Sequence, residues 1–385
     1  MKIRTLFLTL ALFLAVIPAL LAKGITKEQA RTVAFNFLTE RIANHQVNWG
    51  AGSLMLQEVT MLEADELPAI YVFSNHGQGF ILVAADDEMT PVLGYAYEGT
   101  FPEHGSNPNY DSFLGEFLDQ VKFVRQNNEP VSDDVQSAWE KYQDNQMDFS
   151  VLSDTTTLGP LLTCLWNQDN PYNEFCPEDP AGPGGHCYVG CVATAMSMIM
   201  GYYRYPLTGN GSSSYNCPGY GNQYANFGAT AYDWDAMQNT VGNASGQGIP
   251  ANAELQFQAG VSVKMQYAPD GSSAFSEDVP YALKTYFKYS PSVQYVSRGG
   301  YTVTNWENML IEQLDALKPV YYAGKEPSST AGHAFVCDGY QIIGTAKTFH
   351  YNFGWSGSGN GYYTYYITSS KRLIIWSFQM ADFSR

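Results

Sequence analysis

The 385-residue sequence predicts an α+β fold made of two domains that follow a signal peptide. Helical and strand-like periodicities alternate within residues 23–127, and a polar, acidic stretch at 128–157 separates this part from a longer segment rich in Gly, Tyr and Trp. Hydrophobic residues make up 45% of the chain and aromatic residues 15%, which is typical of a chain that folds around buried cores. At this length, each domain can bury a core of its own.

The N-terminus has the features of a secretory signal peptide. Lys2 and Arg4 precede an apolar stretch that Pro18 interrupts, and small residues follow as far as Ala22. Because the apolar stretch is short and no stop-transfer cluster follows it, we expect residues 1–22 to be cleaved off rather than to anchor the chain in a membrane. No later run is apolar for long enough to span a bilayer, so the mature protein is expected to be secreted to the periplasm or outside the cell.

Residues 23–150 are predicted to form the smaller domain. Apolar residues recur at helical spacing after Thr26 and again within 110–127, whereas 69–101 contains short apolar runs separated by turns, as strands do. The stretch 128–157 has few apolar anchors, which predicts an exposed linker that proteases can reach.

Residues 151–385 are predicted to form the larger domain, and the charge and motifs of the chain restrict what it binds. The chain has 20 basic and 37 acidic residues, and its net charge of −17 disfavours nucleic acid and anionic lipid surfaces as partners. The acidic runs at 63–66 and 84–88 lack the ligand alternation of a calcium loop. The glycine-rich run at 354–363 lacks the Lys and the strand-to-helix context of a phosphate-binding loop, so we expect no cofactor.

Cys191 is the strongest candidate for chemistry. It begins the run CVATAMSMIM, which is apolar on nearly every face and predicts a buried central helix that follows Gly190. A thiol at a helix N-terminus lies at the positive end of the helix dipole, which lowers its pKa and favours the nucleophilic thiolate. The alternative is that Cys191 is a disulfide partner, since the chain has six cysteines and is predicted to be exported. A metal site with His186 and Cys187 lacks a convincing fourth ligand.

His333 is the best placed of the six histidines to act as the base that a nucleophilic cysteine needs. It lies in STAGHAFVCDGYQII, where a loop of Ser, Thr and Gly leads into an apolar strand. A rigid strand holds such a side chain in place while its ring faces a cleft. A histidine at the start of a strand is most often structural, but its pairing with Cys191 favours a catalytic role.

Several motifs occur in the order found in the streptopain family of papain-like cysteine peptidases, which the chain resembles over most of its length. They are WNQDNPYN, GCVATAMSMIMGYYRYP, YDWDAM, GVSVKMQYAPDGSSA, KPVYYAG, GHAFVCDGY and NFGWSGSGNGYY, and residues 71–101 resemble the family propeptide. His333 follows Cys191 by 142 residues, which agrees with the span from nucleophile to base in papain-like enzymes. The resemblance implies a papain-like domain at 151–385, with Cys191 on a helical lobe and His333 on a β-rich lobe. It also implies that the α+β domain at 23–150 is an inhibitory propeptide.

The resemblance implies a role for three residues in the reaction itself. Cys191, in Gly-Cys-Val-Ala-Thr-Ala, matches the nucleophile, and His333, in Gly-His-Ala-Phe-Val, matches the general base. Gln168, in Trp-Asn-Gln, matches the side chain that donates into the oxyanion hole together with the Cys191 backbone N–H.

Four further residues match positions around this centre. Asn352 is expected to orient the imidazole and Trp355 to shield it from water, while Ser273 and Gly332 match positions that line the substrate cleft. The family has Trp at the position of Phe353, so the indole expected there is absent. The third catalytic role, which is to orient the imidazole, is therefore the least well matched.

If Cys191 is free and Cys337 is buried on the His333 strand, four cysteines remain for disulfides. The four are Cys164, Cys176, Cys187 and Cys217, and they could form two disulfides in three connectivities. The short loop between Cys176 and Cys187 favours a bond between these two.

The signal peptide and the resemblance together imply a secreted cysteine endopeptidase, made as a zymogen and associated with virulence, that hydrolyses proteins and peptides through an acyl-enzyme without a cofactor. Its partners are the substrates and its own propeptide, and cleavage within 128–157 is expected to activate it. The family implies a preference for an apolar residue just before the cleaved one. Two alternatives are a catalytically silent homologue that binds through its Tyr- and Trp-rich surface and a cell-wall amidase with the same Cys–His chemistry, because a fold does not decide its function.

Overall fold

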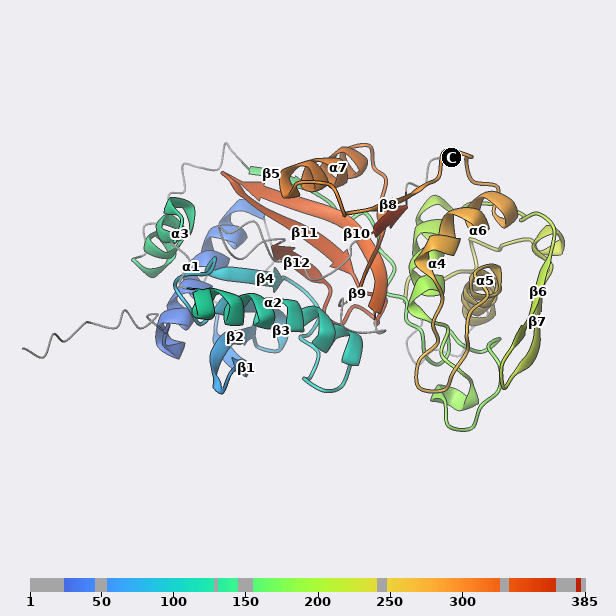
Figure 1. The fold of residues 1–385 in the computed structure, drawn as a ribbon, viewed down its shortest axis with the longest axis horizontal. Helices are drawn as coiled ribbons and strands as arrows, with labels where there is room; N and C mark the ends of the chain where they lie inside the picture. The colour runs from blue at the N-terminus through green and yellow to red at the C-terminus, as the bar shows by residue number, and fades with distance from the viewer. Residues whose placement is uncertain are drawn as a thin grey trace, which may run out of the picture.

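The computed structural model describes residues 24–45, 54–127, 131–144, 155–240, 248–325, 332–364 and 379–381, so the predicted signal peptide lies outside the described residues. Two bodies lie side by side (Figure 1). One is a long twisted sheet covered by helices, and the other is mainly helical. The predicted α+β class is confirmed, with a helical lobe and a β-rich lobe that follow an α+β propeptide domain. No described helix has the length and apolar character needed to cross a membrane.

One 11-stranded sheet joins the propeptide to the β-rich lobe. Its order is β1-β2-β3-β4-β12-β11-β10-β9-β13-β8, with β5 paired to β10, and the pairs are antiparallel. The propeptide strands are β1 (Leu56–Ala64), β2 (Leu67–Asn75), β3 (Gln78–Ala84) and β4 (Val92–Ala96). The other strands are β5 (Thr155–Leu158), β8 (Tyr295–Ser297), β9 (Val320–Lys325), β10 (Gly332–Ile343), β11 (Ala346–Asn352), β12 (Gly361–Thr364) and β13 (Gln379–Ala381). Tyr95 of β4 pairs with Tyr362 of β12, so backbone hydrogen bonds cross directly from the propeptide to the lobe that carries His333.

Three helices belong to the first domain: α1 (Lys27–His45), α2 (Pro108–Asn127) and α3 (Asp133–Gln143). The third lies in the segment 128–157 predicted to be an exposed linker, and most of its residues are exposed or half-buried. Ser132 caps α3, Trp139 and Tyr142 are buried, and the Trp139 indole Nε1–H donates to the Met89 carbonyl at 2.7 Å. Two aromatic anchors and the partly buried Val135 thus dock a helix that is otherwise mostly polar, and pairing of β5 with β10 holds the other end of the segment.

The helical lobe is built around α4 (Cys191–Tyr203), in which every residue from Val192 to Met200 is buried. Such a helix has no solvent face, which is why its sequence is apolar all round. Around it lie α5 (Gly248–Ser262), α6 (Val279–Tyr286) and the hairpin of β6 (Ser213–Cys217) and β7 (Gly221–Ala225). The remaining elements are α7 (Val303–Asp315), which packs on β9 and β10, and the 3-10 turns η2 (Pro183–Gly185), η3 (Phe227–Ala229) and η4 (Ser276–Asp278).

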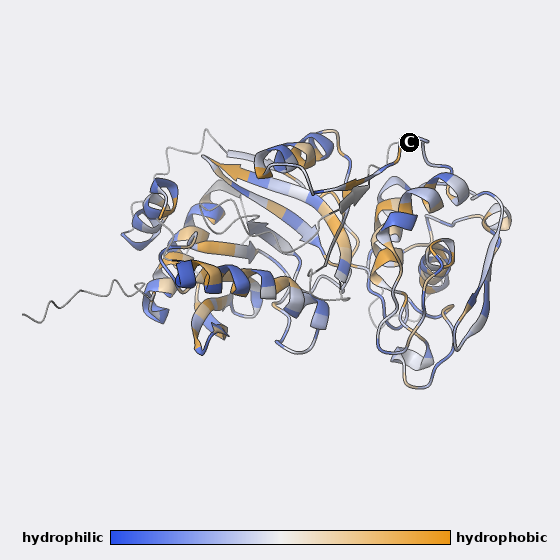
Figure 2. Cartoon of the chain, viewed as in Figure 1, coloured by the Kyte–Doolittle hydropathy of each residue, from blue (hydrophilic) through white to orange (hydrophobic). Residues whose placement is uncertain are grey.

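Two hydrophobic cores follow from this arrangement. One belongs to the helical lobe, whereas the other is shared by the propeptide and the β-rich lobe and contains Phe113 of α2 together with Phe335, Phe353 and Tyr363. Figure 2 shows the apolar residues gathered along the strands of the sheet and along α4. Because the larger core crosses from the propeptide to the strands of the β-rich lobe, loss of the propeptide would expose aromatic side chains of that lobe.

Candidate active site

Gly190 determines how the chain presents Cys191. Its backbone has φ 94° and ψ 137°, a conformation that L side chains rarely adopt. A Cβ at this position would lie 2.6 Å from the Met265 Sδ and 3.1 Å from the Ser272 carbonyl oxygen, so glycine alone fits. The chain therefore turns sharply here and starts α4 with Cys191 as its first residue.

The structure brings Cys191 to the start of β10. Helix α4 packs against β10 and β9, and the Cys191 thiol lies beside the backbone N–H of Ala334, the residue that follows His333. Burial raises the pKa of this thiol, and the nearby backbone N–H groups of Ala334, Val192 and Cys191 oppose the rise without cancelling it. The lowered pKa predicted from the helix N-terminus is thus wrong for the chain with its propeptide in place, because desolvation outweighs the dipole.

His333 is buried in the β-rich lobe and turned towards the loop after β11. Its Nε2–H donates to the Phe353 carbonyl at 2.9 Å, and its ring stacks on Trp355 at 4.3 Å between centroids. Among the described residues, its Nδ1 has no hydrogen-bond partner. Burial lowers the pKa of the imidazole to about 3, which the bond to Phe353 offsets only in part. Near neutral pH the thiol and the imidazole are therefore both uncharged.

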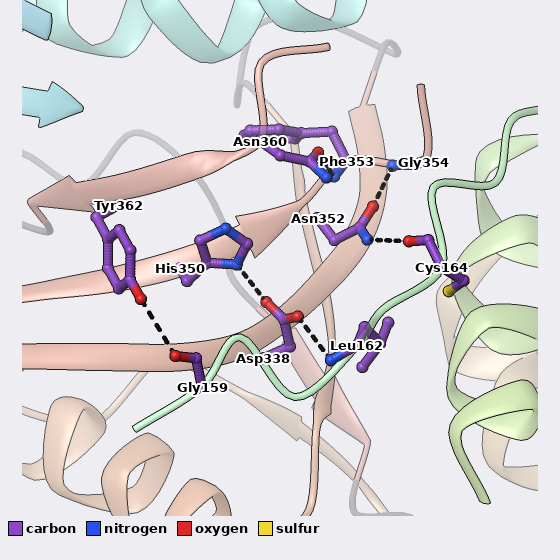
Figure 3. A network of polar contacts seen from close by, with 10 residues as sticks. All are labelled: Gly159, Leu162, Cys164, Asp338, His350, Asn352, Phe353, Gly354, Asn360 and Tyr362. Atoms are coloured by element: carbon purple, nitrogen blue, oxygen red, sulfur yellow. Dashed lines mark hydrogen bonds and ion pairs between the residues drawn. The ribbon is translucent and has the colours of Figure 1, made fainter. Parts of the chain in front are cut away.

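Asn352 does not hydrogen-bond to His333. Its Nδ2 donates to the Cys164 carbonyl at 2.8 Å, and its Oδ1 accepts from the Gly354 N–H at 3.1 Å (Figure 3). The expectation that Asn352 orients the imidazole is not met in this conformation, because both ends of the amide are engaged elsewhere. Trp355 does cover one face of the His333 ring, as a shield from water requires.

Phe353, which stands where the family has Trp, lies between Trp355 and the propeptide. Its ring stacks on Trp355 at 5.1 Å and meets two rings of α2, Phe113 at 5.1 Å and Tyr110 at 5.6 Å. Since the Phe353 carbonyl also accepts from His333, the propeptide packs directly on the residue that holds the imidazole.

Gln168 is buried next to the turn that leads to Cys191. Its carbonyl accepts from the Val189 N–H at 2.9 Å, and its own N–H donates to Asn167 Oδ1 at 2.7 Å. Sequence reasoning missed a residue that supports this arrangement. Gln256 of α5 accepts a hydrogen bond from Thr194 of α4 at 2.7 Å and donates to the Asn167 carbonyl at 3.3 Å. Nothing in the local sequence distinguishes Gln256 from any other polar residue on a helix.

The two residues expected to line the cleft have different environments. Gly332 is partly buried and pairs with Lys325 in the sheet, whereas Ser273 is exposed and pairs with Gln266 through its backbone. The buried neighbour Ser272, which sequence reasoning did not select, donates its hydroxyl to the Tyr188 carbonyl at 2.6 Å. It thereby ties this loop to the turn before Cys191.

All six cysteines are free thiols in the structure, so the predicted Cys176–Cys187 bond is not present. The two residues are nevertheless neighbours, because the Cys187 N–H donates to the Pro177 carbonyl at 2.9 Å. Within the described ranges, no three His, Cys, Asp or Glu side chains gather in a way that could hold a metal ion.

Comparisons with known proteins agree with this architecture. Residues 166–363 match the peptidase C10 family, and residues 22–121 match the Spi protease inhibitor family. The chain is 33% identical to the thiol protease/hemagglutinin PrtT of Porphyromonas gingivalis over 93% of its own length, and spans 40% of that protein. It is 28% identical to streptopain of Streptococcus pyogenes serotype M1, with 88% of this chain and 84% of streptopain covered.

Two solved structures from Prevotella intermedia are also similar. A fragment of prointerpain A matches 85% of this chain and 98% of its own with a TM-score of 0.66 and 28% identity. The active cysteine protease interpain A matches 58% of this chain and 94% of its own with a TM-score of 0.51 and 33% identity.

Proposed function

Because the chain belongs to the peptidase C10 family and is a cysteine-type peptidase with an inhibitor-like propeptide domain, we propose that Cys191 is its nucleophile and His333 its general base. The observation that supports this assignment best is the meeting of α4 and β10. The first residue of a buried helix places its thiol beside the residue that follows His333. Two different lobes thus carry the sulfur and the imidazole to the place where α4 meets β10.

The proposed reaction is hydrolysis of a peptide bond in a protein or peptide. The Cys191 sulfur attacks the carbonyl carbon, and His333 transfers the thiol proton to the leaving amine. Water then attacks the thioester with His333 as base, which releases the acid and restores the thiol. The Cys191 backbone N–H at the start of α4 and the Gln168 side chain would donate to the oxyanion. These steps need no cofactor.

We propose that the propeptide inhibits the enzyme by holding His333 in an unreactive position. With the imidazole bonded to the Phe353 carbonyl and both reacting groups uncharged, the thiolate needed for attack does not form. Phe113 and Tyr110 of α2 pack on the Phe353 ring and keep its carbonyl in place. Removal of α2 frees the loop 352–355, so that the imidazole can turn towards Cys191 and donate its Nε2–H to the Asn352 Oδ1, which leaves Nδ1 to take the thiol proton.

The activating cleavage is proposed to fall between α3 and β5. Helix α3 is anchored to the first domain through Trp139, whereas β5 is paired with β10 of the catalytic sheet. A cut inside either element would have to break these contacts first. The proposed cleavage interval, between α3 and β5, is therefore shorter at both ends than the 128–157 expected from the sequence.

Three properties of the whole protein remain proposals. Residues 1–22 are proposed to direct secretion and then to be removed. The substrates are proposed to carry an apolar residue just before the cleaved one. The enzyme is also proposed to contribute to virulence, which infection assays can test. Ser273 and Gly332 are proposed to line the substrate cleft.

Labelling with a thiol-directed epoxide tests the assignment. The wild-type chain should be labelled once and should cleave casein, whereas Cys191→Ala and His333→Ala should do neither. His104→Ala is the matched control, because this histidine is exposed on the propeptide, and it should behave like wild type. Failure of the wild type to react would favour a silent binding protein. Release of fragments from peptidoglycan but not from casein would favour a cell-wall amidase.

A further inference from the structure

A β-bulge lies in β10, four residues after Ala334. The register with β11 shifts between Cys337 and Gly339, which leaves Asp338 as the extra residue. A bulge redirects the side chain of its extra residue and is frequent next to active sites. Here it points Asp338 into the protein, where its side chain is 0% exposed.

Every described hydrogen-bond partner of the Asp338 side chain and carbonyl lies on β11 or on the segment 159–164. Its Oδ1 is 2.6 Å from Nδ1 of His350, and its Oδ2 accepts from the Leu162 N–H at 3.1 Å (Figure 3). Its backbone carbonyl accepts from the Leu161 N–H at 2.7 Å. A buried carboxylate without such partners would be strongly unfavourable. The proposed catalytic steps use neither Asp338 nor His350.

The segment 159–164 packs closely against this bulge along its whole length. Gly159 has φ 81°, and a Cβ on it would lie 2.4 Å from the Asp338 carbonyl oxygen. The Tyr362 hydroxyl donates to the Gly159 carbonyl at 3.4 Å, and Asn352 donates to the Cys164 carbonyl at 2.8 Å (Figure 3). The segment is therefore held at its start, its middle and its end by residues of β12, β10 and β11.

The same segment leads into two parts of the proposed catalytic machinery. Its last carbonyl fixes the amide of Asn352, which neighbours the loop that holds His333. Four residues later the chain reaches Gln168, and on the way the Trp166 carbonyl accepts from the Ser356 N–H at 3.1 Å. A shift of the segment would consequently move Gln168 and Asn352 together.

We propose that Asp338 and His350 are positioning residues for peptide-bond hydrolysis. His350 holds one oxygen of Asp338, which leaves the other oxygen for Leu162, and the anchored segment then sets the positions of Gln168 and Asn352. The inference rests on the proposed function, because it concerns the efficiency of that same site. A pair with a purely structural role would lower stability but leave the turnover of the folded enzyme unchanged.

The test compares Asp338→Asn, His350→Ala and His350→Gln with wild type, each expressed as the full chain and matured with a trace of wild-type enzyme. Active sites are counted by labelling of Cys191. His350→Ala removes the donor to Asp338, whereas His350→Gln retains an N–H that can replace it. Asp315→Asn is the matched control. Asp315 accepts a hydrogen bond from Tyr340 of the same strand at 2.6 Å and, among the described residues, has no hydrogen bond to the segment 159–164.

Asp338→Asn and His350→Ala should lower kcat about 10- to 100-fold with KM within about twofold of wild type, because misplaced donors weaken the transition state more than the bound substrate. A peptide aldehyde, whose adduct places an oxyanion in the hole, should lose affinity by the same factor, while the matching peptide amide should not. His350→Gln should recover part of the loss, and Asp315→Asn should show none.

Hydrogen exchange shows whether the segment itself has been released. The amides of Leu161 and Leu162 should exchange faster in Asp338→Asn and His350→Ala than in wild type. Unchanged kcat and aldehyde affinity in folded His350→Ala would overturn the inference, even if those amides exchange faster. If Asp338→Asn does not fold, the two His350 variants decide. Failure of wild type to label or to hydrolyse peptides would instead refute the proposed function.

Discussion

Acidification should weaken the zymogen, because His333 is buried in its neutral form. Burial lowers the pKa of this imidazole from the ordinary value of 6.5 to about 3. Below pH 6.5 the unfolded chain takes up a proton at His333, whereas the folded zymogen does not until the pH approaches 3. The contribution of His333 to stability is therefore complete above pH 6.5 and is lost as the pH falls through this window.

The size of this loss of stability follows from the uptake of one proton by His333 in the unfolded chain. Each pH unit within the window is worth about 1.4 kcal/mol, so the fall from pH 6 to pH 4 should remove about 2.5 kcal/mol of unfolding free energy. This is a large share of the stability of an ordinary domain. The same linkage favours any opened state in which His333 regains contact with water, including the one proposed to follow propeptide release.

Urea unfolding of two variants isolates this contribution. Cys191→Ala prevents self-cleavage, and Cys191→Ala with His333→Gln places a neutral side chain where the imidazole was. The unfolding free energy of each is measured at pH 7, 6, 5 and 4. The difference between the two should shrink by about 2.5 kcal/mol from pH 6 to pH 4. Two parallel curves would refute the reasoning, because they would mean that His333 takes up its proton equally in both states.

Other changes test the remaining contacts. Gln168→Ala should lower kcat about 100-fold with little change in KM in a peptide assay, and an unchanged kcat would remove Gln168 from the oxyanion hole. Phe113→Ala should destabilise the zymogen by about 3–5 kcal/mol in urea and speed self-processing, whereas the exposed Phe35→Ala should shift stability by no more than about 0.5 kcal/mol. Trp139→Ala should cost about as much as Phe113→Ala and make α3 the first site of limited proteolysis, and an intact α3 would contradict its docking role.

The elements that carry the two proposed catalytic residues could be predicted from short stretches of sequence. An apolar run after Gly190 is sufficient to predict a buried helix with Cys191 at its start, and an apolar run after His333 is sufficient for a buried strand. The segment 128–157 was less predictable. Its composition is mostly polar, but Val135, Trp139 and Tyr142 recur at helical spacing and dock α3 on the core.

The sequence by itself determined which groups are available for chemistry and which kind of element carries each of them, because residue type and local periodicity are properties of neighbouring residues. Only the tertiary structure decided their protonation, their partners and their access. The pKa of Cys191 and His333 depends on burial by parts of the chain far away in sequence. Likewise, Asp338 meets His350 and Leu162 only because a bulge, a strand pairing and an incoming segment coincide. Desolvation and long-range hydrogen bonds act between residues that a local pattern does not connect.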